Sequence, residues 1–334
     1  MHNIKWLKAG EPADWQFELA NAITSVDELL YELDLEHIEH ELIRNSAFRL
    51  LVPRAFVNKM QKGNAHDPLL RQVLPVTSEN VLSGLTDPVG DLNAMATPGL
   101  LHKYNGRVLL VTTGACAVHC RYCFRRHFPY SSSNPGKNEW QQALEYLHTH
   151  DDIHEVILSG GDPLVLDNAK LGRLFTALEQ IPHIHWLRIH TRLPVVLPSR
   201  IDDELITLLQ KLRFRISFVI HANHANELMI DELEALQRLG SSSITLLNQS
   251  VLLKGVNDCS TSLATLSRRL YEAGVLPYYL HMLDPVQGAM HFDVPQSRAI
   301  EILNALKQAL PGYLLPRLVR EIPGEASKTA IFTI

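Results

Sequence analysis

The chain has 334 residues, a formal charge of −5 from 31 basic and 36 acidic side chains, and an apolar fraction of 46%. These values are typical of a globular protein with one large domain, or with a barrel-sized domain and a smaller one attached. The slight acidity argues against a dedicated nucleic-acid surface, no run approaches the roughly 20 apolar residues that span a bilayer, and the N-terminus lacks the apolar centre of a secretory signal. We therefore expect neither a nucleic acid nor a membrane among the partners of this chain.

The first 95 residues are expected to form a mostly helical region. Residues 15–33 repeat apolar side chains at intervals of three and four, with Ser25 as an N-cap. Residues 38–60 continue the pattern, with a break at Pro53. Residues 62–99 are rich in Gly, Pro, Asn and Asp, which predicts loops with short helices.

From residue 107 onward, short apolar runs alternate with amphipathic helical segments. The runs predict six strands, at residues 107–114, 155–161, 185–191, 215–222, 244–252 and 277–283. Helices are expected between and after them, at residues 139–150, 168–181, 202–212, 226–239, 261–274 and 295–310. Such strands, apolar throughout and separated by helices, indicate a parallel sheet buried on both faces.

Polar residues follow all six predicted strands, and this favours a barrel over an open doubly wound sheet. In a barrel the C-terminal strand ends meet on one face, whereas in an open sheet the polar ends gather at a single switch point. The expected fold class is therefore α/β, a partial (β/α)6 barrel over residues 96–310, followed by a C-terminal segment at 311–334.

Three of the four cysteines lie close together, as Cys116, Cys120 and Cys123, and the fourth is Cys259. This number is too small for a disulfide scaffold in so long a chain, so we expect reduced thiols and a cytoplasmic location. A structural zinc site needs a fourth ligand, and a redox Cys-x-x-Cys pair would leave Cys116 without a role. Three thiolates can instead bind three irons of a [4Fe–4S] cube and leave the fourth iron open.

The motif Cys-x-x-x-Cys-x-x-Cys after the first strand of a partial barrel resembles that of radical S-adenosylmethionine enzymes. The resemblance implies that S-adenosylmethionine chelates the open iron and is cleaved to a 5′-deoxyadenosyl radical. The segment Ser159, Gly160, Gly161 and Asp162 after the second strand matches the part of that family that binds the methionyl group. Glycine there permits a close approach of the backbone.

Longer runs are similar to those of the lysine 2,3-aminomutases, from about residue 66 to residue 328: PGLLHKYNGRVLL, CRYCFRRHF, SGGDPL, TRLPVVLP, NHANE and LLNQSVLLKGVND. That family also uses pyridoxal phosphate, bound as a Schiff base to a lysine that matches Lys328. The resemblance assigns the cofactor phosphate to Lys103, Tyr104 and Arg107. Lys103 stands where the family more often has arginine, and residues 325–327 stand where it has glycines.

The same resemblance implies a lysine substrate held at both ends. Arg125 matches the arginine that binds the substrate carboxylate, and Asp284 and Glu321 match the two acids that bind its distal ammonium group. The family has aspartate at the position of Glu321, so the longer side chain leaves a slightly different ammonium position or chain length open. Arg126 stays unassigned.

Further polar residues after the fourth and fifth strands are candidates for binding S-adenosylmethionine, above all His221 and Gln249, with Asn223, His224 and Asn248 beside them. Each of them is as well explained by a structural role. Cys259 matches a zinc ligand of longer aminomutases whose partner cysteines lie in a C-terminal extension, so we expect no structural zinc here.

The chain resembles the short form of the family, which supplies (R)-β-lysine for the modification of a lysine of translation elongation factor P by a separate ligase. This implies an isomerase that converts L-lysine to (R)-β-lysine through a pyridoxal phosphate aldimine. The expected partners are L-lysine, a reduced flavodoxin- or ferredoxin-type electron donor, elongation factor P with its ligase, and further copies of the chain in a homo-oligomer. Two alternatives stay open: an aminomutase for another amino acid, and a non-enzymatic iron–sulfur protein with a redox or regulatory role.

Overall fold

One sheet organises the protein in the computed structural model, which describes residues 15–38, 42–130, 140–241 and 244–332. The sheet has ten strands among these residues, and they follow one another in sequence order. The strands are β1 (Met95–Thr97), β2 (Leu100–Tyr104), β3 (Arg107–Thr113), β4 (Glu155–Gly160), β5 (Trp186–Thr191), β6 (Arg215–Ile220), β7 (Thr245–Val251), β8 (Leu276–His281), β9 (Arg317–Arg320) and β10 (Thr329–Ala330).

Strands β3 to β9 are parallel, and the remaining strands extend the sheet antiparallel at its two edges. Because the strand order never reverses, the sheet has no switch point of the doubly wound kind. Strands β1 and β10 lie at opposite ends of this order, so the sheet curves without closing. The predicted partial barrel is confirmed, and all six predicted strands are present within two residues of the expected bounds.

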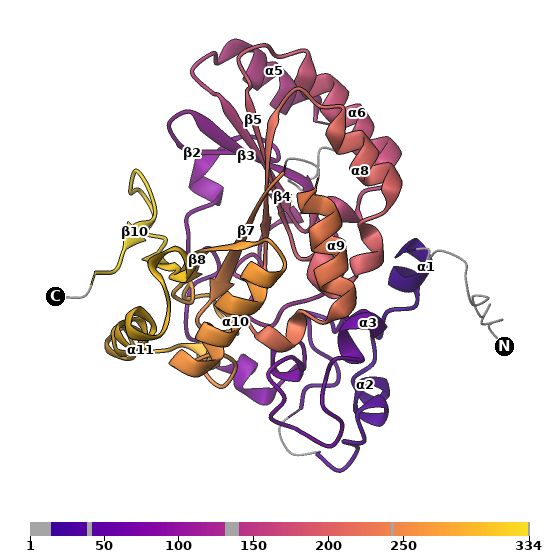
Figure 1. The fold of residues 1–334 in the computed structure, drawn as a ribbon, viewed down its shortest axis with the longest axis vertical. Coiled ribbons are helices and arrows are strands. Elements are labelled where there is room, and N and C mark those ends of the chain that lie inside the picture. The colour runs from indigo at the N-terminus through magenta and orange to yellow at the C-terminus, as the bar shows by residue number, and fades with distance from the viewer. Residues whose placement is uncertain (1–14, 39–41, 131–139, 242–243, 333–334) are drawn as a thin grey trace.

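Helices cover the outer face of the strands as an arc (Figure 1). They are α5 (Gln141–Thr149), α6 (Asn168–Glu179), α8 (Asp203–Gln210), α9 (Ile230–Gly240), α10 (Ser260–Glu272) and α11 (Gln296–Ala309). The short helix α7 (Leu193–Val196) follows closely after β5. Residue 139, where the first of these helices was expected to begin, lies outside the described residues. The side chains of Leu171, Leu174 and Phe175 on α6 are fully buried, and packing of this kind supplies most of the stability of an amphipathic helix.

The N-terminal region is less helical than the sequence predicts. It contains α1 (Trp15–Ala20), α2 (Val26–Glu32) and α3 (Arg54–Val57), and Ser25 caps α2 as expected, since its side chain accepts a hydrogen bond from the backbone of Glu28. Before the expected break at Pro53 the predicted helix is wrong: residues 42–53 are not helical, and residues 39–41 lie outside the described residues. After the break the chain is helical, as α3.

The apolar residues of that stretch are buried in extended backbone instead. Val52 exchanges backbone hydrogen bonds with Ile23, and both side chains are fully buried, so tertiary pairing overrides the helical spacing. The short helices expected within residues 62–99 are present as three 3-10 turns, at Leu70–Gln72, Thr77–Asn80 and Leu92–Ala94.

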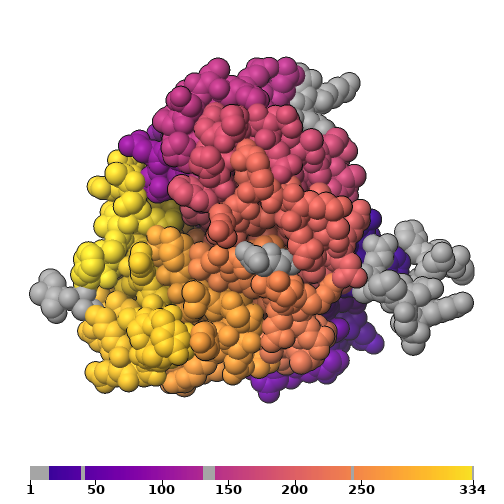
Figure 2. All heavy atoms as spheres, turned by 45° about the horizontal axis from the view of Figure 1, so that its top comes forward, coloured from indigo at the N-terminus to yellow at the C-terminus, as the bar shows by residue number. Residues whose placement is uncertain are grey.

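Besides the short hairpin of β1 and β2, two further hairpins were not predicted. Strands β2 and β3 are joined by Asn105 and Gly106, the latter at φ 74°, and Asn-Gly between apolar runs is a strong hairpin signal that was available in the sequence. Strands β9 and β10 form the second hairpin and bring the C-terminal segment to the sheet. Figure 2 shows this segment, in yellow, on the surface beside the purple residues near position 100.

The division of the chain into regions at residues 95 and 310 stays a prediction. The sheet does not mark these boundaries, since it continues through β1 at one end and through β9 and β10 at the other. None of the helices in the described ranges has the length and apolar character needed to cross a membrane.

We predict that Gly161→Ala destabilises the protein by about 2 kcal/mol or more, because a Cβ atom there would lie 2.1 Å from the carbonyl oxygen of Ala115. The matched control is Gly172→Ala within α6, where the nearest atom would be 3.7 Å away. Alanine favours helix, so this control should raise the thermal midpoint slightly. Thermal unfolding of both variants checks the prediction, and equal shifts would contradict it.

Candidate active site

A single cavity of about 530 Å³ brings together most of the residues that the sequence predicts for the site. It is lined by residues at the C-terminal ends of the parallel strands and by residues of the β2–β3 hairpin. Its lining includes Lys103, Tyr104, Arg107, Cys116, Cys120, Cys123, Arg125, Ser159, Gly160, Gly161, Asp162, His221, Gln249, Asp284, Glu321 and Lys328. The chemical role of each residue stays a prediction; their common location is an observation.

The three cysteines of the loop after β3 all face this cavity. Burial raises the pKa of the Cys123 thiol to about 11, helped by the nearby Cys120, and burial with the neighbouring Cys123 raises the pKa of Cys116 well above its usual value. Thiols bind iron as thiolates, and a positive group among these three half-buried sulfurs would favour the thiolate form. A [4Fe–4S] cluster supplies that charge.

The cysteines are not arranged around one ion. No group of three or more His, Cys, Asp or Glu side chains surrounds a single metal position in the described part of the chain. In an iron–sulfur cube each thiolate binds its own iron, so three separated sulfurs fit the cube better than a mononuclear site. Cys259 is exposed, directly before α10.

Buried arginines hold the cysteine loop. Glu79 accepts hydrogen bonds from Arg121 (Nε, 2.8 Å) and from Arg126 (Nη2, 2.7 Å). Arg126, unassigned from the sequence, also donates to the carbonyl oxygen of Gly288 at 2.8 Å. A buried charge is tolerated only when it is paired, so these contacts fix the loop to the N-terminal region and to the segment after β8.

A third arginine approaches the cysteines from the end of β5. Arg192 donates from Nη1 to the sulfur of Cys120 at 2.7 Å and from Nη2 to Glu227 at 3.0 Å and Gln72 at 2.7 Å. Hydrogen bonds to a cluster ligand sulfur are among the factors that set a cluster potential. Neither Glu227 nor Gln72 was singled out in the sequence, since nothing local marks them.

The glycine segment after β4 lies directly against the cysteine loop. Gly160 has φ 114°, a conformation that side chains disfavour, and the backbone N–H of Gly161 donates to Thr113 at 2.8 Å. Because both residues are glycines, the end of β4 presents backbone and no side chains to the cavity at this point. This fits a ligand that binds along the backbone.

The carboxylate of Asp162 already accepts hydrogen bonds from groups of the protein. Its carboxylate accepts from Thr191 Oγ1 at 2.7 Å, from the backbone of Arg192 at 2.6 Å and from the backbone of Leu164 at 3.0 Å. Burial raises the pKa of Asp162 to about 6 despite these bonds. The contacts join the ends of β4 and β5, so its side chain shapes the cavity wall, and direct binding of S-adenosylmethionine by Asp162 stays a prediction.

The remaining polar candidates divide into two groups. His221, Gln249 and Asn223 line the cavity. Asn248 bonds to the backbone of Ala222 instead, and His224 caps a 3-10 turn, so the structure does not bring these two to the cavity.

Three histidines with buried Nε2 atoms indicate that the cavity suits a polar ligand. The Nε2 atoms of His190, His221 and His281 are buried and have no hydrogen-bond partner among the described residues, and all three side chains line the cavity. Burial lowers the pKa of each imidazole, for His221 to about 4. Buried polar atoms are normally bonded, so these neutral imidazoles fit a cavity that takes up polar cofactors and substrate.

Lys328 and Glu321 are paired across the β9–β10 hairpin. Glu321 follows β9 and Lys328 precedes β10, so their separation of seven residues becomes a contact of 2.6 Å between Nζ and Oε2. Glu321 also pairs with Lys103 at 2.9 Å. Burial alone would raise the pKa of Glu321, but the two lysines outweigh it and lower this pKa to about 2.

Asp284 lies after β8, on the same side of the cavity. Its Oδ1 atom is buried and bonds to no group in the described ranges. Burial, together with the negative charge of Glu321, raises the pKa of Asp284 to about 7. Near pH 7 the two neighbouring carboxyls therefore differ: Glu321 is ionised, whereas Asp284 is partly protonated, and a further positive charge beside it would favour its ionised form.

The cations of the expected phosphate site have different surroundings. Lys103 is clamped between Glu321 and Asp91, the latter at 2.6 Å. The guanidinium of Arg107 lies over the ring of Tyr104, 4.5 Å from its centroid. Burial and the charge of Glu321 raise the pKa of Tyr104 to about 12, so it stays a hydroxyl that can donate.

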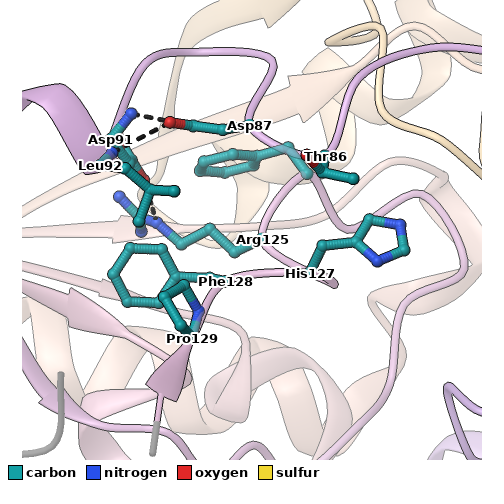
Figure 3. Close-up of a pocket in the computed structure, with 9 residues that line it drawn as sticks. Thr86, Asp87, Asp91, Leu92, Arg125, His127, Phe128 and Pro129 are labelled. Atoms are coloured by element: carbon teal, nitrogen blue, oxygen red, sulfur yellow. Dashed lines mark hydrogen bonds and ion pairs between the residues drawn. The ribbon is translucent and has the colours of Figure 1, made fainter. Parts of the chain in front are cut away.

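Arg125 is held by an acid that the sequence did not indicate. Its Nε donates to Asp91 at 2.6 Å and its Nη1 to Ser159 at 3.2 Å, and Figure 3 shows the first of these bonds. Asp91 and Arg125 also line a smaller cavity of about 40 Å³. Asp91 lies in a stretch read only as loop, and no local pattern separates it from a solvated carboxylate.

Similarity to known proteins agrees with this geometry. Residues 110–263 match the radical SAM superfamily. The chain is 48% identical to the L-lysine 2,3-aminomutase of Escherichia coli (strain K12), over 99% of this chain and 98% of that protein. It is 48% identical to the enzyme of the same name from Haemophilus influenzae, over 96% of each. The L-lysine 2,3-aminomutase of Clostridium subterminale is 34% identical over 95% of this chain and 77% of its own length.

The chain belongs to the L-lysine 2,3-aminomutase family. It is therefore an isomerase of the radical SAM superfamily, and its cofactors are a [4Fe–4S] cluster, S-adenosylmethionine and pyridoxal phosphate. Membership of this family contradicts the alternative of a non-enzymatic iron–sulfur protein.

We predict that Asp284→Asn stabilises the cofactor-free protein in a pH-dependent way. An aspartate in an unfolded chain titrates near 4, whereas the pKa of Asp284 in the folded protein is about 7. Its contribution to stability is thus full below about pH 4 and is lost as the pH rises toward 7.

The variant should therefore raise the thermal midpoint at pH 8, and the gain should shrink as the pH is lowered toward 4. Asp151→Asn, which removes an exposed carboxylate, is the control. Thermal unfolding across this pH range measures the effect, and a gain that does not vary with pH would show that the Asp284 carboxyl is not buried in this way.

Proposed function

We propose that this protein converts L-lysine to (R)-β-lysine, and that a separate ligase attaches the product to a lysine of translation elongation factor P. The observation that carries the proposal is the distribution of charge in the cavity. Arg125 offers a cation at one wall, while Asp284 and Glu321 offer acids beside Lys328. A molecule with a carboxylate at one end and an ammonium group at the other is complementary to this arrangement.

The present contacts support an ammonium site near Glu321. The Nζ of Lys328 itself lies 2.6 Å from Glu321 and also lowers the pKa that burial and Glu321 have raised at Asp284. When Lys328 is engaged with the cofactor, the distal ammonium of a substrate can take over this position. A glutamate side chain would instead bring a third carboxylate to the same place, which argues against glutamate as the rearranged amino acid.

The residues present fit the three cofactors in different parts of the cavity. Cys116, Cys120 and Cys123 would hold the cluster, the segment 159–162 with His221 and Gln249 would hold S-adenosylmethionine, and Lys328 with Lys103, Tyr104 and Arg107 would hold pyridoxal phosphate. When bound, these groups supply an organic radical that removes a hydrogen atom and a conjugated ring that supports migration of the nitrogen.

The protein's own side chains have simpler tasks. Arg125 and the acids orient the substrate along the cavity, and orientation of this kind lowers the entropic cost of a reaction. The neutral imidazoles of His190, His221 and His281 bond to bound molecules without adding charge. Burial of this wall excludes water from the reacting centre, which prevents side reactions.

The partners follow from the same proposal. The cluster requires an electron, and a reduced flavodoxin- or ferredoxin-type protein is the expected donor. The link to elongation factor P comes from the similarity of the whole chain to the short form of the family. A homo-oligomer and a cytoplasmic location stay predictions.

We predict that Lys328→Ala abolishes β-lysine formation and loses bound pyridoxal phosphate, while the cluster absorption is retained. Lys170→Ala, at an exposed position of α6, is the matched control and should behave as the unaltered protein. Reconstituted, reduced protein is incubated with L-lysine, S-adenosylmethionine and pyridoxal phosphate, and products are identified by mass spectrometry. Rearrangement of another amino acid in place of L-lysine would contradict the substrate assignment.

We predict that cells without this protein contain elongation factor P whose mass lacks the β-lysyl addition. Reintroduction of the unaltered protein should restore that addition, and reintroduction of Lys328→Ala should not. Intact-mass measurement of purified elongation factor P checks this directly. A β-lysyl addition that persists without the protein would exclude the proposed role in this modification.

A further inference from the structure

Five charged side chains form a continuous series of alternating sign along one wall of the cavity. Arg125 pairs with Asp91 at 2.6 Å, Asp91 with Lys103 at 2.6 Å, Lys103 with Glu321 at 2.9 Å, and Glu321 with Lys328 at 2.6 Å. The series begins at the expected carboxylate site and ends at the lysine expected to hold the cofactor. Asp91 is the member that has no assigned role.

Asp91 lies in a loop, residues 87–91, that hydrogen bonds hold in place. Asp87 accepts hydrogen bonds from the backbone N–H groups of Asp91 at 2.9 Å and Leu92 at 3.0 Å, and Figure 3 shows both. The carbonyl oxygen of Val89 in the same loop accepts from Lys103 at 2.8 Å. The Asp91 side chain is only 2% exposed, so its charge is compensated by protein groups and not by water.

This carboxylate determines how Arg125 faces the cavity. Asp91 accepts the hydrogen bond from Nε of Arg125, and Ser159 accepts the one from Nη1. Nη2 has no partner among the described residues and can donate to the carboxylate of a substrate. A guanidinium is a planar fork, and fixing one edge fixes the direction of the other. Rotation of Arg125 would break a bond to a buried acid, which is costly.

Asp91 also fixes the position of Lys103. A lysine ammonium is a point charge on a flexible stem, so its position depends on its partners. Asp91 and Glu321 hold the Nζ of Lys103 from two sides. Without Asp91, the cations of Arg125 and Lys103 would lie near one another with no anion between them, and each would move away from the other.

We infer that Asp91 is a positioning residue that sets the geometry between the substrate-carboxylate site at Arg125 and the cofactor-phosphate site at Lys103. The inference rests on the proposed function, because it takes the roles of these two cations from it. Asp91 itself touches neither ligand; it acts through the two side chains that do.

The test compares two ligands that differ only in the group that Arg125 binds. L-lysine and pentane-1,5-diamine, which lacks the carboxylate, are titrated into reconstituted holoenzyme without reductant, and the cofactor absorption band reports binding. In Asp91→Asn the affinity for L-lysine should fall about tenfold, which corresponds to about 1.4 kcal/mol. The affinity for the diamine should change less than twofold.

Three controls make the result decisive. Asp151→Asn, at an exposed position, should bind both ligands normally. Arg125→Lys alone should weaken L-lysine binding, and adding Asp91→Asn to it should weaken binding no further, because the two residues act as a unit. Retained pyridoxal phosphate, read from the same band, shows that the variants are folded. In turnover assays, the KM for L-lysine should rise in Asp91→Asn more than kcat falls.

Equal loss of affinity for L-lysine and for the diamine in Asp91→Asn would overturn the inference, because it would indicate a general loosening of the cavity. So would normal binding of L-lysine by the variant, or an additive effect in the double variant. Failure of the unaltered holoenzyme to bind L-lysine would instead contradict the proposed function, and the role of Arg125 with it.

Discussion

The ion pairs of Glu321 with Lys328 and Lys103 are the interactions on which the arrangement of the site depends. They tie the β9–β10 hairpin at one edge of the sheet to the β2–β3 hairpin near the other edge. The sheet does not close by backbone pairing, so side-chain charge bridges its open side. Because burial of an unpaired charge is expensive, each of these groups is more stable in the cavity wall with an oppositely charged partner beside it.

The same requirement shapes the cysteine loop. Glu79 pairs with Arg121 and Arg126 below the loop, and Glu227 pairs with Arg192 beside it. Two of these arginines act on the thiols: Arg192 donates to the sulfur of Cys120, and the charge of Arg126 opposes the rise in pKa that burial causes at Cys123. A loop held in this way keeps its sulfurs in place before a cluster arrives, and it keeps the neighbouring Arg125 at a set distance from them.

Much of the barrel was readable from the chain, because buried parallel strands and their covering helices have strong periodic patterns. The errors have local causes. Residues 42–53 carry helical spacing, but pairing of Val52 with Ile23 makes them extended. The hairpin at Asn105 and Gly106 had a clear signal that the longer apolar runs obscured. Strands β9 and β10 are only four and two residues long, too short for a pattern to show.

The sequence by itself determined the chemical groups of the site: three thiols at fixed spacing, a glycine pair after a strand, and a lysine seven residues beyond an acid. It determined them because the resemblance and the motifs depend on residues close together in the chain. Only the tertiary structure decided which buried charges meet. Asp91 is 34 residues from Arg125, and Arg192 is 72 from Cys120. Contacts over such separations depend on how the sheet curves and which groups burial forces to pair, and no local pattern records either.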